Sequence, residues 1–428
     1  MLYDRLGNLE GARVVGYSSG QKSTLIVGGG IAGLAAAVAL HQAGQKASVL
    51  ERYDRTADDV GAWLQIASNG MMALDAVGLG AAAGEVGTAT TRLTTFAPDG
   101  RTTADTPLGK GPGQRLAGRS VRRSDLYRLL REEVERLGIE VIRGARVVAT
   151  EQIGTLLRVH TASNESYTAE LVIGADGIDS AVRASIIGEK THPRSTMPDL
   201  VGVGGIADAN TLPSHFETPV GSLHFRFGRD CFLGSVGMDD GKTWWFVNPR
   251  LAALPGGAAS ASSMSSREWS HTLGDLAGRD ALPIRHLVEG TPELDVWASA
   301  GRSNAVLWGS GSVALIGDAA HAIPPTSGQG ASLALEDAVI LGDIVRAGGS
   351  PCDIVPELAR RRTKRVTKIG AQGVALDRAK LLGPFASIVR DRIIFPLTDR
   401  RSSSTGKTPT PWMYDFAIDS TKRRGFRR

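Results

Sequence analysis

Thr24-Leu-Ile-Val-Gly28-Gly29-Gly30-Ile31-Ala32-Gly33 decides how the first part of this chain folds. The residues before Gly28 predict a short buried strand, and the apolar run after Gly33 predicts a helix that ends at Gly44. Gly28 permits the tight turn, Gly30 lets the backbone approach a pyrophosphate, and Gly33 lets helix and strand pack closely. Because the free N–H groups at the helix start would face the phosphates, the pattern predicts a dinucleotide-binding unit.

A second strand follows and ends in an acid. Lys46-Ala-Ser-Val-Leu-Glu51 places this acid 18 residues after Gly33. A carboxylate at that distance accepts hydrogen bonds from the adenosine ribose and repels a 2′-phosphate. Strand, turn, helix, strand and acid therefore occur in the order that a dinucleotide site requires.

Almost 300 residues later, a further segment suits the same ligand. Ser312-Val-Ala-Leu-Ile-Gly317-Asp318 reads as a buried strand that ends in an acid, and a helix is predicted over 331–346. Between them, Pro324-Pro325 stiffens the chain ahead of a glycine-rich helix start. A helix N-terminus carries partial positive charge, which suits a flat ring system that becomes anionic on reduction.

Two more motifs lie between these segments. One is Leu171-Val-Ile-Gly174-Ala175-Asp176-Gly177, followed closely by Ser180 and Arg183; the other is Arg123-Ser124-Asp125-Leu126, which opens an amphipathic helix. With its glycine turn, "DG" motif (Asp176-Gly177) and "GD" motif (Gly317-Asp318), the chain resembles the single-component FAD-dependent monooxygenases of the p-hydroxybenzoate hydroxylase type. The resemblance covers roughly residues 24 to 350, with the motifs in the family order.

This resemblance implies roles for individual residues. Arg123 would touch the flavin, Asp318 would hydrogen-bond the ribityl chain of FAD, and residues 328–331 would present backbone N–H groups to the pyrimidine edge of the ring. Asp176 would take part in handling FAD and NAD(P)H or hold its own turn together, and Ser332 replaces an asparagine common in relatives. The complete set expected to bind noncovalent FAD is Gly28, Gly30, Ile31, Ala32, Gly33, Glu51, Arg52, Arg123, Asp176, Asp318, Pro325, Gly328, Gly330 and Ala331.

The reaction implied by the resemblance is insertion of one oxygen atom from O2. NADPH or NADH would reduce FAD, and a flavin C(4a)-hydroperoxide would transfer oxygen to an aromatic or other electron-rich small molecule. No metal is required, and His321 is expected to be structural. Two alternatives remain open: an epoxidase of an isoprenoid or polyketide alkene with the same flavin chemistry, and an FAD-binding protein without turnover.

The predicted fold class is α/β, with a Rossmann-like FAD-binding domain, an inserted antiparallel β-sheet substrate domain and C-terminal helices. Short aromatic segments around 222–227, 231–236 and 243–247 indicate the antiparallel sheet. The expected parts are an N-terminal extension (1–23), the first part of the FAD-binding domain (24–190, with a connecting excursion over 61–120), the substrate-binding sheet (191–305), the second part of the FAD-binding domain with C-terminal helices (306–395) and a basic tail (396–428).

The substrate pocket is expected to draw on that sheet and on the excursion. His224 and Arg226 share one face of a strand, and Phe225 and Phe227 share the other. We predict that His224 and Arg226 are catalytic and face a phenolate or carboxylate, with His224 as a possible base. If the aromatic face lines the pocket instead, the substrate is apolar and flat or an alkene. The predicted pocket residues are Trp63, Gln65, Phe225, Phe227, Trp245 and Phe246.

Composition limits the remaining possibilities. With 42% hydrophobic and 22% charged residues, the 428-residue chain has the composition of a soluble globular protein. Its net charge of +5 is matched by five basic residues among the last seven, 422–428, so no nucleic-acid partner is expected. The two cysteines form no C-x-x-C pair, and no apolar run is long enough for a transmembrane helix. We expect a cytoplasmic monomer or homodimer.

Overall fold

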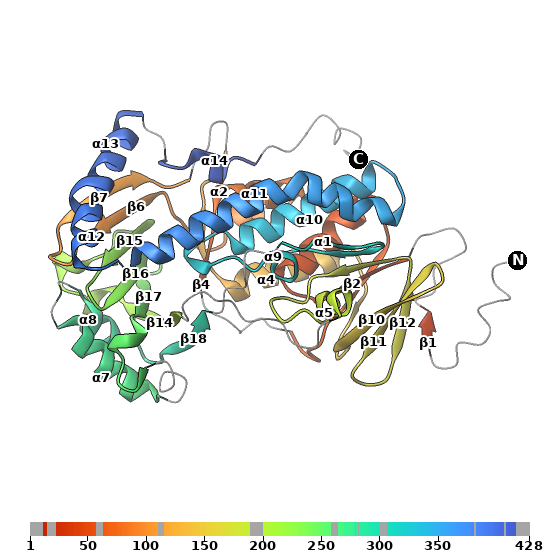
Figure 1. Ribbon diagram of the computed structural model, residues 1–428, viewed down its shortest axis with the longest axis horizontal. Helices are drawn as coiled ribbons and strands as arrows, with labels where there is room; N and C mark the ends of the chain where they lie inside the picture. Colours follow the sequence, from red (N-terminus) through yellow and green to blue (C-terminus); the bar gives the residue numbers. More distant parts are fainter. Residues whose placement is uncertain are drawn as a thin grey trace, which may run out of the picture.

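The computed structural model describes residues 12–14, 23–56, 63–109, 115–188, 200–257, 264–278, 280, 282–299, 306–380, 382–405 and 408–416. Figure 1 shows the large sheet around β15–β17 at one end of the molecule, the small sheet with β10–β12 at the other, and β2 of the parallel sheet between them. Helix α11 (Pro351–Lys380) runs lengthwise from one end toward the other. The mixed α/β architecture confirms the predicted fold class.

The parallel sheet brings the predicted FAD motifs together. Its order is β19-β20-β13-β2-β3-β9, and all neighbours are parallel except β19 and β20. The glycine turn follows β2, the DG motif follows β13 and the GD motif follows β20, so all three lie at the carboxyl ends of adjacent strands. The strands are β2 (Thr24–Val27), β3 (Ala47–Leu50), β9 (Val141–Ile142), β13 (Leu171–Gly174), β19 (Gly309–Ser310) and β20 (Val313–Leu315).

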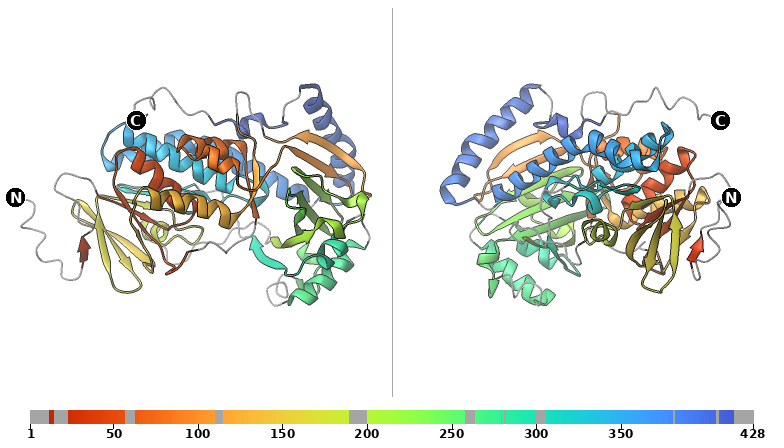
Figure 2. Two further views of the ribbon diagram at one scale, coloured as in Figure 1. Left: turned by 180° about the vertical axis from the view of Figure 1, so that it is seen from behind. Right: turned by 45° about the vertical axis from the view of Figure 1, so that its right-hand side comes forward.

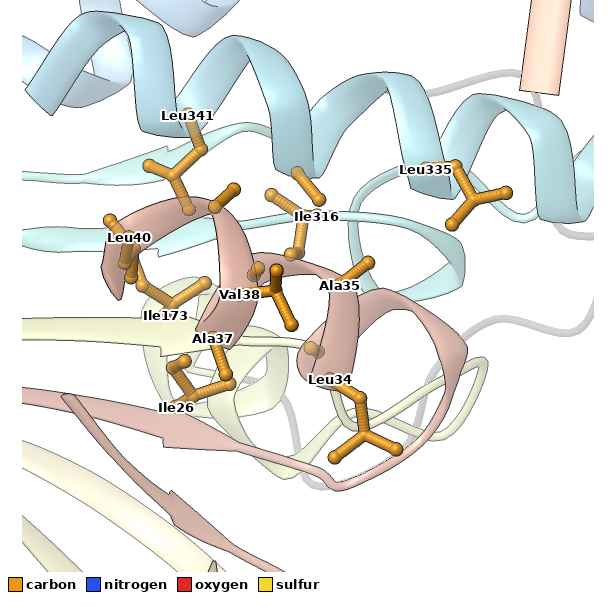
Figure 3. Close-up of a cluster of buried hydrophobic side chains, with 14 of the residues drawn as sticks. Ile26, Leu34, Ala35, Ala37, Val38, Leu40, Ile173, Ile316, Leu335 and Leu341 are labelled. Atoms are coloured by element: carbon orange, nitrogen blue, oxygen red, sulfur yellow. The ribbon is translucent and has the colours of Figure 1, made fainter. Parts of the chain in front are cut away.

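Helix α1 (Ile31–Gln42) lies between this sheet and helix α10 (Gly330–Arg346), as Figure 3 shows. Its residues 33–40 are all buried, and several are alanines, whose small side chains let α10 approach closely. A Cβ added at Gly342 of α10 would lie 2.9 Å from the carbonyl oxygen of Ala39. The core therefore contains the helix that follows the glycine turn, which fixes the position of that turn.

The seven-stranded sheet has the order β18-β14-β17-β16-β15-β6-β7. One of its faces packs against helices α7 (Ser266–Ala277) and α8 (Ile284–Glu289) through Trp269 and Ile284. Its strands are β6 (Arg92–Phe96), β7 (Thr102–Pro107), β14 (Leu200–Asp208), β15 (Ser222–Phe227), β16 (Cys231–Gly237), β17 (Lys242–Pro249) and β18 (Asp295–Ser299).

Two strands of this sheet differ from the predicted division of the chain. β6 and β7 come from the excursion that we placed within the first part of the FAD-binding domain, yet β6 pairs in parallel with β15. Both strands are rich in threonine and contain few large apolar residues, so their sequences lack the apolar alternation of a core strand. The boundary at 190 remains a prediction for the rest of the chain.

Two smaller sheets complete the strands. β4 (Trp63–Ile66), β8 (Arg119–Arg122) and β5 (Thr88–Ala89) form one, in the order β4-β8-β5. β1 (Ala12–Val14), β12 (Ser166–Ala169), β11 (Leu156–Thr161) and β10 (Val147–Ile153) form the other. The N-terminal extension thus contributes β1, which pairs in parallel with β12. Its other residues up to 22 lie outside the described ranges.

The remaining helices surround the sheets. No helix in the described part of the chain is long and apolar enough to span a membrane. These helices are α2 (Ser68–Ala76), α3 (Gly80–Gly84), α4 (Arg123–Arg136), α5 (Ala181–Ile187), α9 (Asp318–His321), α12 (Pro384–Val389), a π-helical turn η6 (Arg390–Ile394), α13 (Phe395–Thr405) and α14 (Pro411–Tyr414), with short 3-10 turns η2 (Ala209–Thr211), η3 (Ser214–Phe216), η4 (Leu251–Ala253) and η5 (Pro325–Ser327).

Candidate active site

The glycine turn has the geometry that its sequence predicts. Gly28 has φ +104°, and an added Cβ would lie 2.5 Å from the carbonyl oxygen of Ala175. Both the backbone conformation and the lack of space therefore require glycine at this position. An added Cβ at Gly33 would lie 1.9 Å from the carbonyl oxygen of Gly28. At Gly30, by contrast, the Cβ would meet no atom within 4 Å. The turn is therefore tightly packed on its protein side and open at the start of α1.

The acid after β3 is held beside this turn. Glu51 Oε2 accepts a hydrogen bond from the Gly29 N–H at 2.7 Å, and Oε1 accepts one from the Tyr53 N–H at 3.0 Å. The carboxylate thus lies where a ribose contact is predicted. Arg52, which we also predicted to bind FAD, is exposed and lies over the Tyr53 ring, with 4.6 Å between Cζ and the ring centroid.

The DG motif closes its own turn. Asp176 Oδ2 accepts a hydrogen bond from the Val182 N–H at 3.2 Å, at the start of α5, and burial raises the pKa of the carboxyl. Its buried Oδ1 has no hydrogen-bond partner among the described residues. Arg183 on α5 donates to the carbonyl oxygens of Ala319 and Ala320 at 3.1 and 3.0 Å. This helix therefore ties the DG motif to the GD motif.

Asp318 is the first residue of α9, directly after the GD-motif glycine. Gly317 before it has φ +58°, and the Asp318 side chain is exposed. Nevertheless, desolvation by the surrounding protein raises the pKa of its carboxyl, and the charges of His321 and Arg123 oppose that shift. Arg123, half-buried at the start of α4, is thus close enough to act on Asp318. Its neighbour Arg122 points elsewhere, with Cζ 6.0 Å from the Trp244 ring centroid.

A buried ionic cluster lies beside the GD motif. Arg362 of α11 donates to Asp337 at 2.7 Å and to Glu336 at 2.5 Å, and Arg365 donates to both oxygens of Glu336. His321 Nε2 hydrogen-bonds Asp337 at 2.6 Å. Burial raises the pKa of Asp337, but the charges of His321 and Arg362 outweigh it and hold the pKa below its usual value. His321 therefore belongs to this cluster, in keeping with the structural role expected for it.

The cluster and helix α11 also hold in place the loop that ends at the start of α10. Asp337 Oδ2 accepts a hydrogen bond from the Gly317 N–H at 3.0 Å, and α11 packs under Pro324 and Ser327, which an added Cβ at Gly373 would meet at 3.3 and 3.2 Å. Pro325 is exposed and Gly328 has φ +62°. The loop is therefore packed against α11 on one side, while Pro325 on its other side is exposed to solvent.

Ser332, at the first turn of α10, is buried against helix α2. Its hydroxyl accepts a hydrogen bond from the Ala67 N–H at 3.0 Å, and an added Cβ at Gly70 would lie 2.6 Å from Ser332 Oγ. A side chain larger than serine would therefore displace α2. This packing gives a physical reason for the departure from asparagine at this position.

An aromatic wall covers the face of the seven-stranded sheet that looks toward the FAD motifs. Rings of the sheet contact one another at centroid distances of 5.0 to 5.8 Å, and Trp63 of β4 reaches across to Phe246 at 5.9 Å and Trp244 at 6.2 Å. Gln65 of β4 lies nearer the loop before α10 (residues 324–329), which we call the flavin loop: its Cβ is 4.0 Å from a Cβ added at Gly328. The aromatic wall consists of Trp63, Phe225, Phe227, Phe232, Trp244 and Phe246.

The predicted catalytic pair lies on the opposite face. Arg226 is buried over the Phe96 ring, 3.9 Å from its centroid, and His224 contacts the same ring edge-on at 5.0 Å. Burial and the Arg226 charge lower the pKa of His224 to about 4, and burial lowers the pKa of Arg226 to about 10. The structure contradicts the orientation that we predicted for His224 and Arg226. The aromatic face, which is the alternative that we left open, is the one that lies toward Trp63 of β4 and Lys380 of α11.

Trp245 shares the face of His224. It is fully buried in the core formed with α7 and α8, and its indole N–H donates to Thr291 Oγ1 at 2.9 Å. The alternation of side chains along β17 thus separates Trp245 from Trp244 and Phe246. Its predicted place in the substrate pocket is therefore wrong for a geometric reason.

One charged residue at the aromatic wall was missed by the sequence analysis. Lys380, the last residue of α11, donates to Asn248 Oδ1 at 2.8 Å and to Thr326 Oγ1 at 2.7 Å. Its Nζ lies 4.4 Å from the centroid of Phe232, and burial lowers the pKa of the ammonium group to about 8. Thr326 also donates to Asp377. Lys380 therefore joins the flavin loop to the aromatic wall.

Comparison with known protein families matches residues 21–347 to the FAD binding domain family. The chain belongs to this family. A relative is 3-amino-4-hydroxybenzoate 2-monooxygenase of Streptomyces platensis, 31% identical over 82% of this chain and 86% of that protein. Another is 3-hydroxybenzoate 6-hydroxylase of Polaromonas naphthalenivorans, 27% identical over 81% and 84%. HpxO of Klebsiella pneumoniae, solved with FAD and uric acid, has the same fold, with a TM-score of 0.75 at 22% identity over 92% of this chain and 98% of that one.

These findings confirm the predicted family and reaction class. The chain is an FAD-dependent monooxygenase, an oxidoreductase that uses NAD(P)H and O2 to act on a small molecule. The residues present also fit the cofactor. The start of α1 is open at Gly30, and Asp176 Oδ1 is buried without a hydrogen-bond partner among the described residues. Asp318 is accessible to solvent, although the protein around it raises the pKa of its carboxyl.

Proposed function

We propose that this monooxygenase hydroxylates a flat, electron-rich aromatic substrate whose apolar body lies against the aromatic wall and whose ionisable oxygen lies near Lys380. The aromatic wall is the observation that carries the proposal, because it is the sheet face that looks toward the flavin loop. Rings of this kind prefer offset or edge-on contacts with another flat ring. The named relatives act on hydroxylated benzoates, which are electron-rich aromatic rings.

The predicted cofactor residues would hold FAD across the carboxyl ends of the parallel strands. The N–H groups at the start of α1, with Ile31 and Ala32, would take the pyrophosphate, and Glu51 would take the adenosine ribose. Asp318 would accept hydrogen bonds from the ribityl chain, with Arg123 beside it. N–H groups of Gly328, Gly330 and Ala331 would stabilise negative charge on the reduced ring.

Bound FAD, reduced by NAD(P)H, supplies the activated oxygen. The protein contributes position and exclusion of water: the aromatic wall would orient the substrate ring and keep solvent out of the reaction space. The Lys380 ammonium would stabilise negative charge on the substrate oxygen, which makes the ring more electron-rich. Its place between Thr326 of the flavin loop and Asn248 of the sheet supports this role.

The aromatic wall also suits an alkene, so the epoxidase alternative remains a second candidate. The two candidates differ in what they require of Lys380, because an alkene has no ionisable oxygen for the ammonium to bind. NADH and NADPH consumption and product mass should be measured with a phenol, a quinolone and an isoprenoid alkene. A gain of one oxygen on an aromatic ring supports the proposal, and oxygen gain with the alkene alone would overturn it.

The proposal also covers the oligomeric state, the cellular location and the absence of a nucleic-acid partner. We propose that the enzyme works as a monomer or homodimer, in the cytoplasm, without a nucleic-acid partner. The charge distribution supports the last point, since the excess of basic residues is confined to the C-terminal part of the chain. Light scattering of the purified protein would measure the oligomeric state.

A further inference from the structure

The C-terminal helical segment (residues 384–405) exposes an unusual number of large apolar side chains. Of the ten large hydrophobic residues that are exposed in the described part of the chain, five lie in the 13-residue stretch 385–397 of this segment. Their exposed fractions range from 51% to 81%. Clustered apolar side chains of this kind indicate an interaction surface rather than scattered surface residues. These residues are Phe385, Ile388, Ile393, Ile394 and Leu397.

The inner side of the segment is firmly packed, so the exposure is not that of a detached helix. Phe395 contacts Phe227 at a ring-centroid distance of 5.3 Å, and Arg390 is buried over the same ring at 4.3 Å. Arg390 also pairs with Asp391 and donates to the Ala379 carbonyl oxygen at 2.7 Å. Figures 1 and 2 show α12 and α13 along the outer end of the molecule. The segment therefore has one packed and one exposed side.

The segment itself is positively charged. Residues 384–405 contain four Arg against two Asp, a net charge of +2. On the segment, Arg392 and Arg400 are exposed. Its two acids are engaged: Asp391 is buried against Arg390, and Asp399 accepts a hydrogen bond from the Asp105 N–H at 2.9 Å. The apolar surface is therefore flanked by unopposed basic side chains.

We propose that this segment docks on an anionic lipid surface, with its apolar side chains entering the headgroup boundary. An amphipathic helix with large apolar residues on one side and basic residues around them binds anionic membranes through both kinds of contact. A second copy of the chain is a poorer occupant. In a two-fold dimer the same surface meets itself, which would bring the net positive charges of two segments together.

The position of the segment links docking to substrate supply, a step that rests on the proposed function. Its inner side contacts Phe227 of the aromatic wall, so docking holds that wall next to the lipid. An apolar substrate partitions into a bilayer, where its concentration exceeds that in water. The enzyme would thus take its substrate from the membrane surface. Lipid docking itself does not depend on which substrate is used.

Flotation of the FAD-loaded enzyme with vesicles tests the docking. In about 0.15 M salt, it should float with vesicles containing phosphatidylglycerol and not with pure phosphatidylcholine. The double variant Ile388→Ser and Leu397→Ser should bind at least tenfold more weakly. The matched variant Val148→Ser and Val220→Ser removes two exposed apolar residues elsewhere and should bind as wild type. Arg392→Gln with Arg400→Gln should also weaken binding to the anionic vesicles.

Three outcomes would overturn the proposal: wild type that floats with neither vesicle, equal loss in both serine variants, or a wild-type dimer that the Ile388 and Leu397 changes convert to a monomer. FAD content and turnover of a water-soluble substrate should be unchanged in all these variants. Supply from lipid is tested separately, because vesicles should accelerate turnover of a lipid-dissolved substrate by wild type and not by the serine variant. Docking without any turnover would refute the proposed function alone.

Discussion

The ionic cluster beside the GD motif, which we call the floor, and the aromatic wall are built from different kinds of interaction. The floor is a buried ionic cluster in which Arg362 pairs with Glu336 and Asp337 at 2.5 to 2.7 Å. The wall consists of aromatic rings and one buried ammonium group. Charged hydrogen bonds have strict geometry, whereas ring contacts tolerate several arrangements. Under the proposed function, the ionic cluster would fix the flavin loop in one position, whereas the wall would select the substrate by shape.

Arg362→Met should have the largest effect, because it breaks the floor. The change leaves Glu336 and Asp337 buried without their main cation, and breaking a buried pair in this way costs about 3 to 5 kcal/mol. Denaturant unfolding of the variant should show this loss together with poor FAD retention. Arg360→Met, which removes an exposed partner of Glu357 on the same helix, is the matched control and should change little. Equal stability of the two variants would contradict a structural role for the cluster.

Gly30→Leu should remove FAD without unfolding the protein. An added side chain meets no protein atom within 4 Å, so the apoprotein should fold normally while the pyrophosphate space is filled. We expect a loss of more than about 3 kcal/mol, over a hundredfold in the Kd for FAD. Titration of the apoprotein with FAD measures it. Gly84→Leu in α3, also facing open space, should bind FAD normally.

Asp318→Ala should weaken FAD binding by about 1 to 3 kcal/mol, the usual cost of removing a hydrogen-bond acceptor. Arg123→Ala should weaken it as well, because Arg123 lies near Asp318 on the cofactor side. Arg122→Ala should not, because Arg122 is exposed and lies near Trp244. The same effect from both arginine variants would indicate general surface charge, and unchanged binding in Asp318→Ala would refute its ribityl contact.

The two faces of the seven-stranded sheet can be distinguished by the coupling of NAD(P)H oxidation to product formation. Phe246→Ala opens the wall, so an ill-positioned substrate should raise hydrogen peroxide per NAD(P)H by about tenfold. His224→Gln and Arg226→Met lie on the opposite face and should leave coupling unchanged with normal FAD content. Peroxide measured for all three variants with one substrate decides the matter. Uncoupling by the His224 and Arg226 variants alone would restore the orientation that we first predicted.

The sequence predicts the cofactor site better than the wall for a physical reason. The glycine turn and its helix are local, and parallel strands bring their carboxyl ends together whatever else the chain does. A strand reading His-Phe-Arg-Phe has two plausible inner faces, and only the packing of α7, α8 and Trp63 decides between them. Arg362 was missed because its acidic partners lie 25 residues or more away in the chain. Lys380 was missed because only Asp377 is a local partner, while Asn248 and Thr326 are distant in sequence. The sequence signal for the ionic cluster was the pair of adjacent acids, Glu336 and Asp337, in the otherwise apolar helix α10.

Lys380 places a positive charge against the aromatic wall, and changing it should have the smallest effect. Burial lowers the pKa of its ammonium group to about 8, so the positive charge is present below pH 8 and lost above it. If the ammonium binds the substrate oxygen, the apparent KM of an ionised phenol should rise about fivefold above that pH, the equivalent of about 1 kcal/mol for one hydrogen bond. Lys380→Gln keeps a donor for Asn248 and Thr326 but does not titrate, so its KM should be uniformly raised and independent of pH. An alkene substrate should show no such dependence with either enzyme. A wild-type KM for the phenol that is flat from pH 7 to pH 9 would remove Lys380 from substrate binding and leave it as the link between the flavin loop and the sheet.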